Sequence, residues 1–282
     1  MKKLKTLVVY KRSSLSVAGK WASRLGKVKR FQDNHTAHFA TLRAIEKVLT
    51  ANGIPYDKRS RGPRVDFTAY DLVITVGGDG TVLEAARSLA NHQMILAVNS
   101  DPAWSVGQFC SADVTTFEML LKKFLCGKAQ LRRLYKLKLV IKDEATSRQI
   151  ECLNDILICH TNPAAMSRYT ITIGGEEEDQ RDSGIWISTA AGSTGAMASA
   201  GGLAMPLDST ALQYKPRELY HGRGVRQQLS GGLVAKPGKI IITSMMPRGV
   251  IFVDGSHIKL PFTYGHRAEI SSSKNFVQLV HA

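Results

Sequence analysis

A glycine-rich run at residues 77–81 constrains the fold of this chain more than any other feature. Gly77-Gly78-Asp79-Gly80-Thr81 directly follows Asp71-Leu72-Val73-Ile74-Thr75-Val76, which has the pattern of a buried strand, and a helical pattern covers residues 82–91. Strand, tight turn and helix in this order predict one unit of a parallel α/β sheet. Ligands of such sheets bind at the carboxyl ends of the strands, where this run lies. Glycines let the backbone approach an anion closely, and the start of a helix offers free N–H groups. The run therefore predicts a phosphate site.

Asp79 is unusual in a phosphate-binding turn because its carboxylate repels phosphate. A carboxylate there suggests either a hydroxyl group to be oriented or deprotonated, or a metal ion to be held. The alternative interpretation is a tight turn with an Asp helix cap. The run is neither a Rossmann G-x-G-x-x-G nor a Walker loop, since residue 83 is Leu and no Gly-Lys-Ser/Thr follows.

The N-terminal part of the chain predicts further elements of a doubly wound parallel sheet. Residues 5–10 and 94–98 read as strands, and residues 36–52 read as a helix that Asn52-Gly53 ends. After about residue 130 the pattern changes to short β-branched runs separated by turn residues, which predicts an antiparallel sheet or sandwich. These runs cover residues 134–142, 153–159, 169–173, 185–189, 239–245 and 249–253. No element is predicted between residues 203 and 228, and Glu176-Glu177-Glu178-Asp179 is expected at a solvated hairpin tip.

The formal net charge is +15, and most of it lies in the first quarter of the chain. Residues 1–70 hold 16 Lys and Arg against 4 Asp and Glu. Such a surplus implies polyanionic partners, which include nucleic acid, membrane surfaces and phosphate-rich small molecules. The sequence has no apolar run near the roughly 18–20 residues of a membrane span, and no basic helix with interleaved aromatics. Partners are therefore expected to be neither nucleic acid nor membrane. Four cysteines without C-x-x-C spacing predict a cytoplasmic protein with reduced thiols.

Residues 77–81 resemble the signature shared by NAD kinases, lipid kinases of the diacylglycerol and sphingosine type and, more loosely, phosphofructokinases. Leu153-Asn154-Asp155 resembles the Asn-Glu motif of NAD kinases. Residues 188–202 resemble their Gly-Ser-Thr-Ala-Tyr segment with its later Ser-Ala-Gly-Gly, and residues 252–255 resemble their late Asp-Gly turn. Lipid kinases should carry Gly-Thr-x-Asn-Asp, whereas residues 100–104 here are Ser-Asp-Pro-Ala-Trp. Order and spacing over roughly residues 5–280 indicate a divergent NAD kinase.

The resemblance implies phosphoryl transfer from ATP, or from polyphosphate, to the 2′-hydroxyl of the adenosine ribose of NAD or NADH. It implies an α/β domain over residues 1–130 and a β-rich, sandwich-like nucleotide-binding domain over residues 131–261. The segment 262–282 would return to the first domain as its final strand. A homodimer or homotetramer is expected. Mg²⁺ or another divalent metal would act mainly through the substrate phosphates, with no protein ligand assigned.

The resemblance also assigns roles to residues. Asp79 would accept or orient the proton of the ribose hydroxyl as the new P–O bond forms. The backbone of Gly77, Gly78 and Gly80, with Thr81, would contact phosphate, and Lys11 and Arg12 would face the donor phosphates unless they form a solvated strand end. The remaining nucleotide-binding candidates lie in the β-rich part: Asn154, Asp155, Arg181, Thr194, Gly195, Ala196, Ser199 and Asp254.

Several positions depart from the family pattern. Asp155 replaces the commoner Glu, Ser183 stands where many members have Asp with Asp182 one residue earlier, and Ala196 replaces Tyr. Asn99-Ser100-Asp101 lacks the usual Asn-x-Gly. The choices between NAD and NADH and between ATP and polyphosphate stay open. A lipid kinase, which shares the glycine motif, and a non-catalytic nucleotide-binding protein are the alternative functions.

Overall fold

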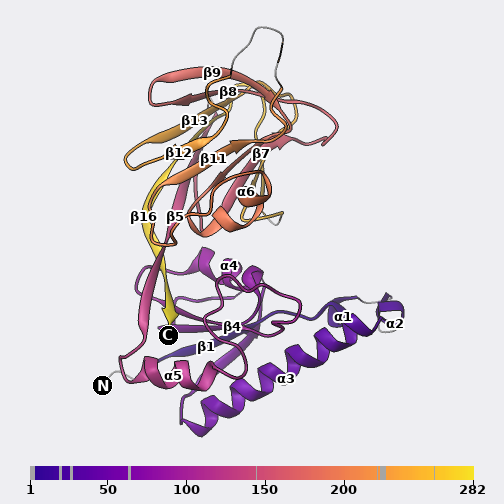
Figure 1. Cartoon of the computed structure of the whole chain (residues 1–282), viewed down its shortest axis with the longest axis vertical. Coiled ribbons are helices and arrows are strands. Elements are labelled where there is room, and N and C mark those ends of the chain that lie inside the picture. Colours follow the sequence, from indigo (N-terminus) through magenta and orange to yellow (C-terminus); the bar gives the residue numbers. More distant parts are fainter. Residues whose placement is uncertain are drawn as a thin grey trace. The chain divides into compact units, whose positions relative to one another are not determined.

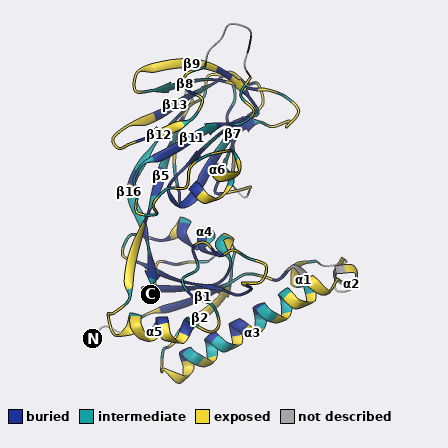
Figure 2. Ribbon diagram, in the orientation of Figure 1, coloured by how far each residue is buried: buried dark blue, intermediate teal, exposed yellow. Residues whose placement is uncertain are grey.

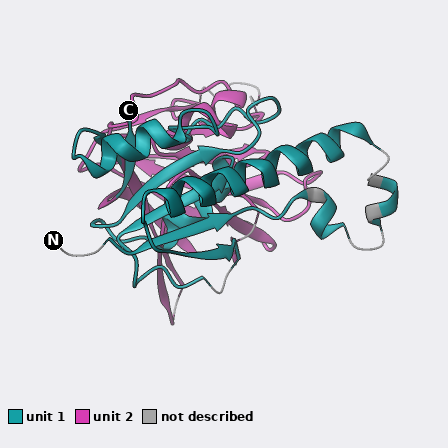
Figure 3. Cartoon of the chain, turned by 90° about the horizontal axis from the view of Figure 1, so that it is seen from below, with its two compact units in different colours: residues 1–133, 277–282 teal, residues 134–276 magenta. Residues whose placement is uncertain are grey.

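A computed structural model describes residues 4–18, 21–25, 28–62, 65–143, 145–220, 222, 227–256 and 258–282. The chain divides into two compact units, shown in Figure 3. Unit 1 comprises residues 1–133 and 277–282, and unit 2 comprises residues 134–276. No helix among the described residues is long and apolar enough to cross a membrane.

The helices are α1 (Ser14–Val17), α2 (Ala22–Leu25), α3 (Lys29–Ala51), α4 (Asp79–Ser88), α5 (Phe117–Leu125) and α6 (Ala196–Ser199), with a 3₁₀ turn η2 (Ala191–Thr194). The first strands are β1 (Thr6–Tyr10), β2 (Tyr56–Ser60), β3 (Leu72–Gly77), β4 (Met94–Asn99), β5 (Gln130–Lys142), β6 (Ser147–Cys152), β7 (Asp155–His160) and β8 (Ser167–Ile173). The later strands are β9 (Glu176–Asp182), β10 (Ile185–Ser188), β11 (Leu212–Pro216), β12 (Gly232–Val234), β13 (Lys239–Ser244), β14 (Gly249–Val253), β15 (Ile258–Pro261) and β16 (Arg267–His281).

Unit 1 is built on a parallel sheet, as the sequence predicts. Its strands lie in the order β2-β1-β3-β4, and the end of β16 adds to β4 through the parallel pairs Gln278↔Met94 and Leu279↔Ile95. The expected return of the final strand is confirmed. Because β1 and β3 are parallel in register, with Tyr10 opposite Val76, their carboxyl ends meet at one edge of the sheet.

Helices cover both faces of this sheet (Figure 1). α3 and α5 lie together on one face, where Leu42, Ile45 and Leu120 join a buried cluster with Ile74 and Val98. α4 covers the other face (Figures 1 and 3). Figure 2 shows β1 buried, whereas the edge strand β2 and the outer side of α3 are exposed.

Two helices of unit 1 begin earlier than the sequence predicts. α3 begins at Lys29, whereas the sequence predicts a start near residue 36. The first residues of α3 show no apolar periodicity, since its buried positions run only from His38 to Leu49, and the prediction therefore missed them. α4 begins at Asp79, so the glycine-rich run forms its first turn. Both helix starts were predicted from hydrophobic periodicity, and an exposed first turn has no apolar residues to show it.

Unit 2 is a sandwich of antiparallel strands, which confirms the predicted β-rich part. One sheet contains β5, β6, β8, β9, β13 and the first part of β16, and the other has the order β12-β11-β10-β7-β14-β15. Side chains from both sheets share one core, among them Leu139, Tyr169, Ile187, Ile242 and Ile251.

The acidic run 176–179 is not at a hairpin tip. It forms the start of β9, paired with β8 from Ile173↔Glu176 onward. The tip is Gly174-Gly175, whose φ angles of 62° and 93° favour glycine. The acidic side chains are mostly exposed, as expected for one outer face of an antiparallel sheet.

Candidate active site

The glycine-rich run forms the junction between β3 and α4 in unit 1. A Cβ atom on Gly77 would lie 2.3 Å from Oγ1 of Thr81, and one on Gly78 would lie 2.5 Å from Oγ of Ser105. A larger residue at either position would therefore have to displace a neighbouring hydroxyl group. Gly78 is the N-cap of α4, and no side chain caps this helix. The first turn of α4 thus presents backbone N–H groups and the positive end of the helix dipole, which suit a phosphate.

The carboxylate of Asp79 does not cap its own helix. Its Oδ2 accepts a hydrogen bond from the backbone N–H of Gln108 (3.0 Å), and its Oδ1 accepts one from Phe109 (2.9 Å). Both oxygens are therefore oriented by the loop between β4 and α5. Each carboxylate oxygen has two lone pairs, so each still has one to accept a ligand hydroxyl. Burial, together with the charge of Asp79, raises the pKa of Cys110 to about 12, so this neighbouring thiol stays neutral.

Lys11 lies beside the glycine-rich run, as the parallel register predicts. Its backbone N–H donates to the carbonyl of Val76 (3.1 Å), and its Cβ is 3.6 Å from where a Cβ on Gly77 would be. Burial lowers the pKa of Lys11, while the charge of Asp101 opposes this shift and that of Arg61 adds to it. Arg12 follows it and is exposed at the strand end.

Arg61 is a candidate that the sequence did not reveal. Its backbone N–H donates to the carbonyl of Tyr10 (2.9 Å), directly after β2. Its Nη1 lies 3.3 Å from where a Cβ on Gly80 would be, and its Nε is 3.6 Å from Oε2 of Glu84. Lys11 and Arg61 thus flank the run from two strands. The sequence did not predict β2, and so did not place Arg61, because β2 is an edge strand whose exposed polar centre shows no apolar periodicity.

In unit 2, Asp254 fixes the turn that carries Asn154 and Asp155. Its carboxylate accepts hydrogen bonds from the backbone N–H of Leu153 (3.2 Å) and Asn154 (2.7 Å), and its own N–H donates to the carbonyl of Asp155 (2.9 Å). Asp254 is 4% exposed and has a φ of 47°. The side chain of Asn154 donates to Oδ2 of Asp155 (2.9 Å). Asn154, Asp155 and Asp254 therefore lie together, and the hydrogen bonds of Asp254 hold the backbone of the turn.

The glycine- and threonine-rich segment packs against the same turn. Thr189 donates through Oγ1 to the carbonyl of Leu153 (2.5 Å) and through its backbone N–H to that of Asn154 (3.0 Å). A Cβ on Gly195 would lie 3.8 Å from Nδ2 of Asn154. Thr194 and Ser199 are exposed and free to face a ligand. The structure thus brings the Asn-Asp turn together with η2.

A pocket of about 530 Å³ lies beside α6, and several of its lining residues were not predicted. Ala196 and Ser199 line it from α6, Trp186 from β10, and Arg217 and Glu218 from the end of β11. Trp186 supplies an aromatic surface in the pocket where Ala196 replaces the family's Tyr. The sequence does hold a sign of this position. Trp186 lies between Ile185 and Ile187, whose side chains enter the core, so its own side chain points to the other face of the strand.

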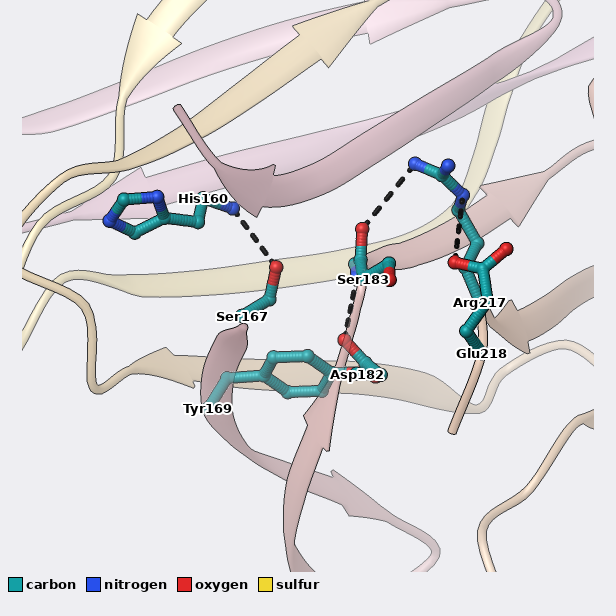
Figure 4. A network of polar contacts seen from close by, with 8 residues as sticks. His160, Ser167, Tyr169, Asp182, Ser183, Arg217 and Glu218 are labelled. Atoms are coloured by element: carbon teal, nitrogen blue, oxygen red, sulfur yellow. Dashed lines mark hydrogen bonds and ion pairs between the residues drawn. The ribbon is translucent and has the colours of Figure 1, made fainter. Parts of the chain in front are cut away.

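Asp182 does not replace the Asp that is missing at position 183 (Figure 4). It accepts hydrogen bonds from the hydroxyl of Tyr169 and from the backbone N–H of Gly184 (2.6 Å), and burial raises its pKa to about 6. The carbonyl of Ser183 accepts a hydrogen bond from Nη1 of Arg217 (3.4 Å). Arg181 has an exposed side chain on β9 and does not line the pocket beside α6.

Asp155 should give unit 2 a pH-dependent stability. Burial, with the charge of Asp254, raises its pKa from 3.8 to about 7. The folded state therefore binds the proton more tightly, so this contribution to stability is greatest below about pH 4 and is lost as the pH rises to about 7. We expect Asp155→Asn to be more stable than the wild type at pH 8, with a difference that shrinks toward pH 4.

Urea unfolding of both proteins across this pH range measures the effect. Asp208→Asn, the same substitution at an exposed position of the same unit, is the matched control. A pH-independent gain in Asp155→Asn would contradict the assignment of the buried proton to this carboxyl.

Comparison with known proteins gives consistent results. Residues 8–128 match the family model of the ATP-NAD kinase N-terminal domain. The chain is 32% identical to a probable NADH kinase of Oryza sativa, covering 90% of this chain and 85% of the relative. It is 34% identical to an NADH kinase of Arabidopsis thaliana, and the match covers 72% of this chain and 70% of the relative.

Two solved structures show the same fold. An NAD kinase from Archaeoglobus fulgidus in complex with ATP superimposes with a TM-score of 0.71 and 21% identity, covering 98% of this chain and 93% of the other. The yeast NADH kinase complexed with NADH superimposes with a TM-score of 0.70 and 17% identity, and the match covers 100% of this chain and 84% of the other.

Proposed function

The chain belongs to the NAD kinase family, and on this premise we propose that it phosphorylates the 2′-hydroxyl of the adenosine ribose of NAD(H), with ATP as the donor. The observation that carries this proposal is Asp79, a carboxylate with both oxygens oriented at the start of α4 and with glycines on either side. A site that only bound phosphate would gain nothing from this charge. A site that transfers phosphate to a hydroxyl needs an acceptor for its proton.

In the proposed reaction, the 2′-oxygen forms a bond to the γ-phosphorus of ATP while the bond to the β-γ bridging oxygen breaks and ADP leaves. Asp79 takes the hydroxyl proton as the new bond forms. The first turn of α4, Lys11 and Arg61 hold the donor phosphates and balance their charge. The transition state of phosphoryl transfer is loose, so positioning and charge neutralisation supply most of the catalysis.

Residues of unit 2 would hold the dinucleotide. The Asn154 amide and Asp155 carboxyl offer donors and acceptors to base and ribose edges, and the exposed Thr194, Gly195 and Ser199 form an adjoining surface. The two relatives that match most of this chain are named a probable NADH kinase and an NADH kinase, while a bifunctional NADP phosphatase/NAD kinase matches 55% of it at 32% identity. Ser183 also lacks the acid that many NAD kinases have. We therefore place NADH ahead of NAD as the acceptor.

Steady-state assays of NADP and NADPH formation test this function. Purified protein is incubated with NAD or NADH, with ATP or polyphosphate, and with Mg²⁺. We expect product with ATP and a higher kcat/KM for NADH than for NAD. Failure to phosphorylate either dinucleotide with any donor would overturn the proposal. Phosphorylation of a lipid alcohol in liposomes would support the lipid-kinase alternative instead.

Arg61→Ala should raise the KM for ATP by about tenfold to a hundredfold, because a charge-assisted contact to phosphate is worth about 1.5–3 kcal/mol. The KM for the dinucleotide should not change. Arg59→Ala is the matched control, since Arg59 lies on the same strand with an exposed side chain. Glu84→Gln should lower the KM for ATP, because Glu84 pairs with the Arg61 guanidinium when no donor is bound. An equal rise of both KM values in Arg61→Ala would contradict this role.

The remaining parts of the proposal concern the metal, the assembly and the compartment. Mg²⁺ would bind mainly through the substrate phosphates, with no protein ligand assigned. The metal would offset phosphate charge in the transition state. Among the described residues, no group of three His, Cys, Asp or Glu could hold a metal ion. A homodimer or homotetramer and a cytoplasmic location complete the proposal.

A further inference from the structure

A buried lysine in unit 2 has no part in the roles described above. Lys136 lies on β5 and is 3% exposed. A lysine is almost never fully buried unless its charge is paired, because taking an ammonium group out of water is costly. The acidic groups near Lys136 therefore indicate what its charge is used for.

Two carboxylates act on the charge of Lys136. Burial lowers the pKa of Lys136, while the charge of Glu151 and then that of Asp254 oppose this shift. Glu151 lies on β6, whereas Asp254 accepts the backbone N–H groups of the turn that carries Asn154. One ammonium group thus lies near both a strand residue and a residue of the candidate dinucleotide site.

The strand pairing gives an independent reason for this arrangement. β5 and β6 are antiparallel, and Leu137 opposite Cys152 is the pair at the end of β6. Lys136 is the next residue of β5, so it lies beside Leu153, which follows β6. The backbone N–H of Leu153 donates to Oδ2 of Asp254 (3.2 Å). The carboxylate of Asp254 is therefore at the same end of the strand pair as Lys136.

Glu151 has several other groups that stabilise its charge. Its Oε1 accepts hydrogen bonds from Oγ of Ser273 (2.5 Å) and from Nδ2 of Asn275 (3.0 Å), and its Oε2 also lies within reach of that amide (2.9 Å). Lys138 is directly opposite Glu151 in the strand pair, and opposite residues share one face of a sheet. Lys136 is therefore not needed to balance Glu151 alone.

Asp254 is in a less favourable electrostatic position. Its carboxylate is 4% exposed and lies near a second buried acid, since its charge contributes to the raised pKa of Asp155. Its φ of 47° lies in the left-handed region, where a residue other than glycine must be held by its surroundings. A buried anion beside another acid needs a nearby cation to stay ionised. Lys136 supplies a cation there.

We propose that Lys136 is a positioning residue for dinucleotide binding, because its charge holds the Asp254 carboxylate in place. Asp254 in turn holds the backbone of Leu153 and Asn154 in the form that binds the dinucleotide. The proposal rests on the proposed function, which assigns the acceptor dinucleotide to this turn. It makes the affinity for NADH depend on a buried lysine that acts through another residue.

NADH binding to Lys136→Met tests this role. Methionine keeps most of the length of the side chain and removes the charge, so Asp254 takes up a proton or turns away and loses a backbone hydrogen bond. Titration followed by the fluorescence of NADH should give a Kd about tenfold to a hundredfold above that of the wild type, the effect of one hydrogen bond to a charged group. The KM for ATP should change by less than about twofold, because the donor-site residues of unit 1 are untouched.

A double variant, Lys136→Met with Glu151→Gln, separates positioning from folding. It removes both charges of the β5–β6 pair, so urea unfolding should give a stability closer to the wild type than that of Lys136→Met alone. If Lys136 positions Asp254, the Kd for NADH stays raised in the double variant, because the second change leaves Asp254 without its cation. If Lys136 only balances Glu151, the Kd returns to the wild-type value, and the proposal is overturned.

Lys142→Met is the matched control. Lys142 lies on the same strand and also pairs with a carboxylate, Oε1 of Glu269, at 2.9 Å, but this pair is exposed and away from the Asn154 turn. Its Kd for NADH should equal that of the wild type. An unchanged Kd in Lys136→Met, or an equal rise in Lys142→Met, would overturn the role of Lys136.

The same titration distinguishes this role from the kinase function. Binding of NADH needs no turnover, so the comparison between variants remains decisive even for a protein that forms no NADPH. Wild-type protein that binds NADH and forms no NADPH with any donor would overturn the kinase function alone. Wild-type protein that does not bind NADH would overturn both.

Discussion

We expect Asp79→Asn to lower kcat for NADP(H) formation by about a hundredfold to ten-thousandfold, the range typical of a lost general base. Asn has the size of Asp but cannot take a proton from the ribose hydroxyl. The glycine-rich backbone, Lys11 and Arg61 remain in place, so the KM for ATP should change by less than about threefold. Initial rates at saturating NADH and ATP measure kcat, and titration of ATP gives KM.

The variant also disturbs the loop between β4 and α5, and this effect needs its own control. An Asn amide can accept only one of the two hydrogen bonds from Gln108 and Phe109, which should cost about 1–3 kcal/mol of stability. Asn99→Ala loosens the same loop because Nδ2 of Asn99 donates to the carbonyl of Ser105 (2.9 Å), while it leaves Asp79 intact. If the two variants lost stability and activity equally, Asp79 would act only by holding the loop.

The candidate residues of unit 1 could be predicted because their signals are local. A buried strand, a glycine-rich turn and a helix follow one another in the chain, so the position of Asp79 and the proximity of Lys11 follow from sequence and parallel pairing. Arg61 could not be predicted in this way, because it depends on the register of an exposed edge strand.

In unit 2, the sequence also could not show which of two neighbouring residues points out of the core. Ser183 follows Asp182, so either could have faced the ligand. Only the burial of Asp182 against Tyr169 assigns its carboxylate to the core (Figure 4). Likewise, Trp186 and Glu218 meet in one pocket because β10 and β11 pair in antiparallel register, with Trp186 opposite Lys215. Pairing partners so far apart in sequence are set by tertiary packing.

The uneven charge of the chain is explained in part by the same geometry. Lys11 and Arg61 flank the glycine-rich run, and Arg30 stacks on Trp104 beside it, so three of the basic residues in the first quarter surround one site. Arg12 and Arg59 are exposed, and their charges raise the local potential that would attract a polyanionic donor.

Gly192→Ala should destabilise unit 2, because Gly192 packs directly against the turn that carries Asn154. A Cβ on Gly192 would lie 2.2 Å from the carbonyl oxygen of Asn154 and 2.7 Å from its carbonyl carbon. Both are backbone atoms that cannot turn aside, so η2 or the Asn154 turn must move. Overpacking of this kind typically costs about 1–3 kcal/mol, and a shift of about 1 Å in a positioning residue can cost a hundredfold in rate. We expect both losses, with kcat/KM for NADH falling by about a hundredfold.

Thr194→Ala is the control for folding, since Thr194 lies two residues later in η2 and its side chain is exposed. Urea unfolding should therefore place Thr194→Ala within about 0.5 kcal/mol of the wild type and Gly192→Ala well below it. If Gly192→Ala kept both its stability and its kcat/KM for NADH, the close approach of η2 to Asn154 would not be what shapes this part of the site, and the dinucleotide would have to be held elsewhere in unit 2.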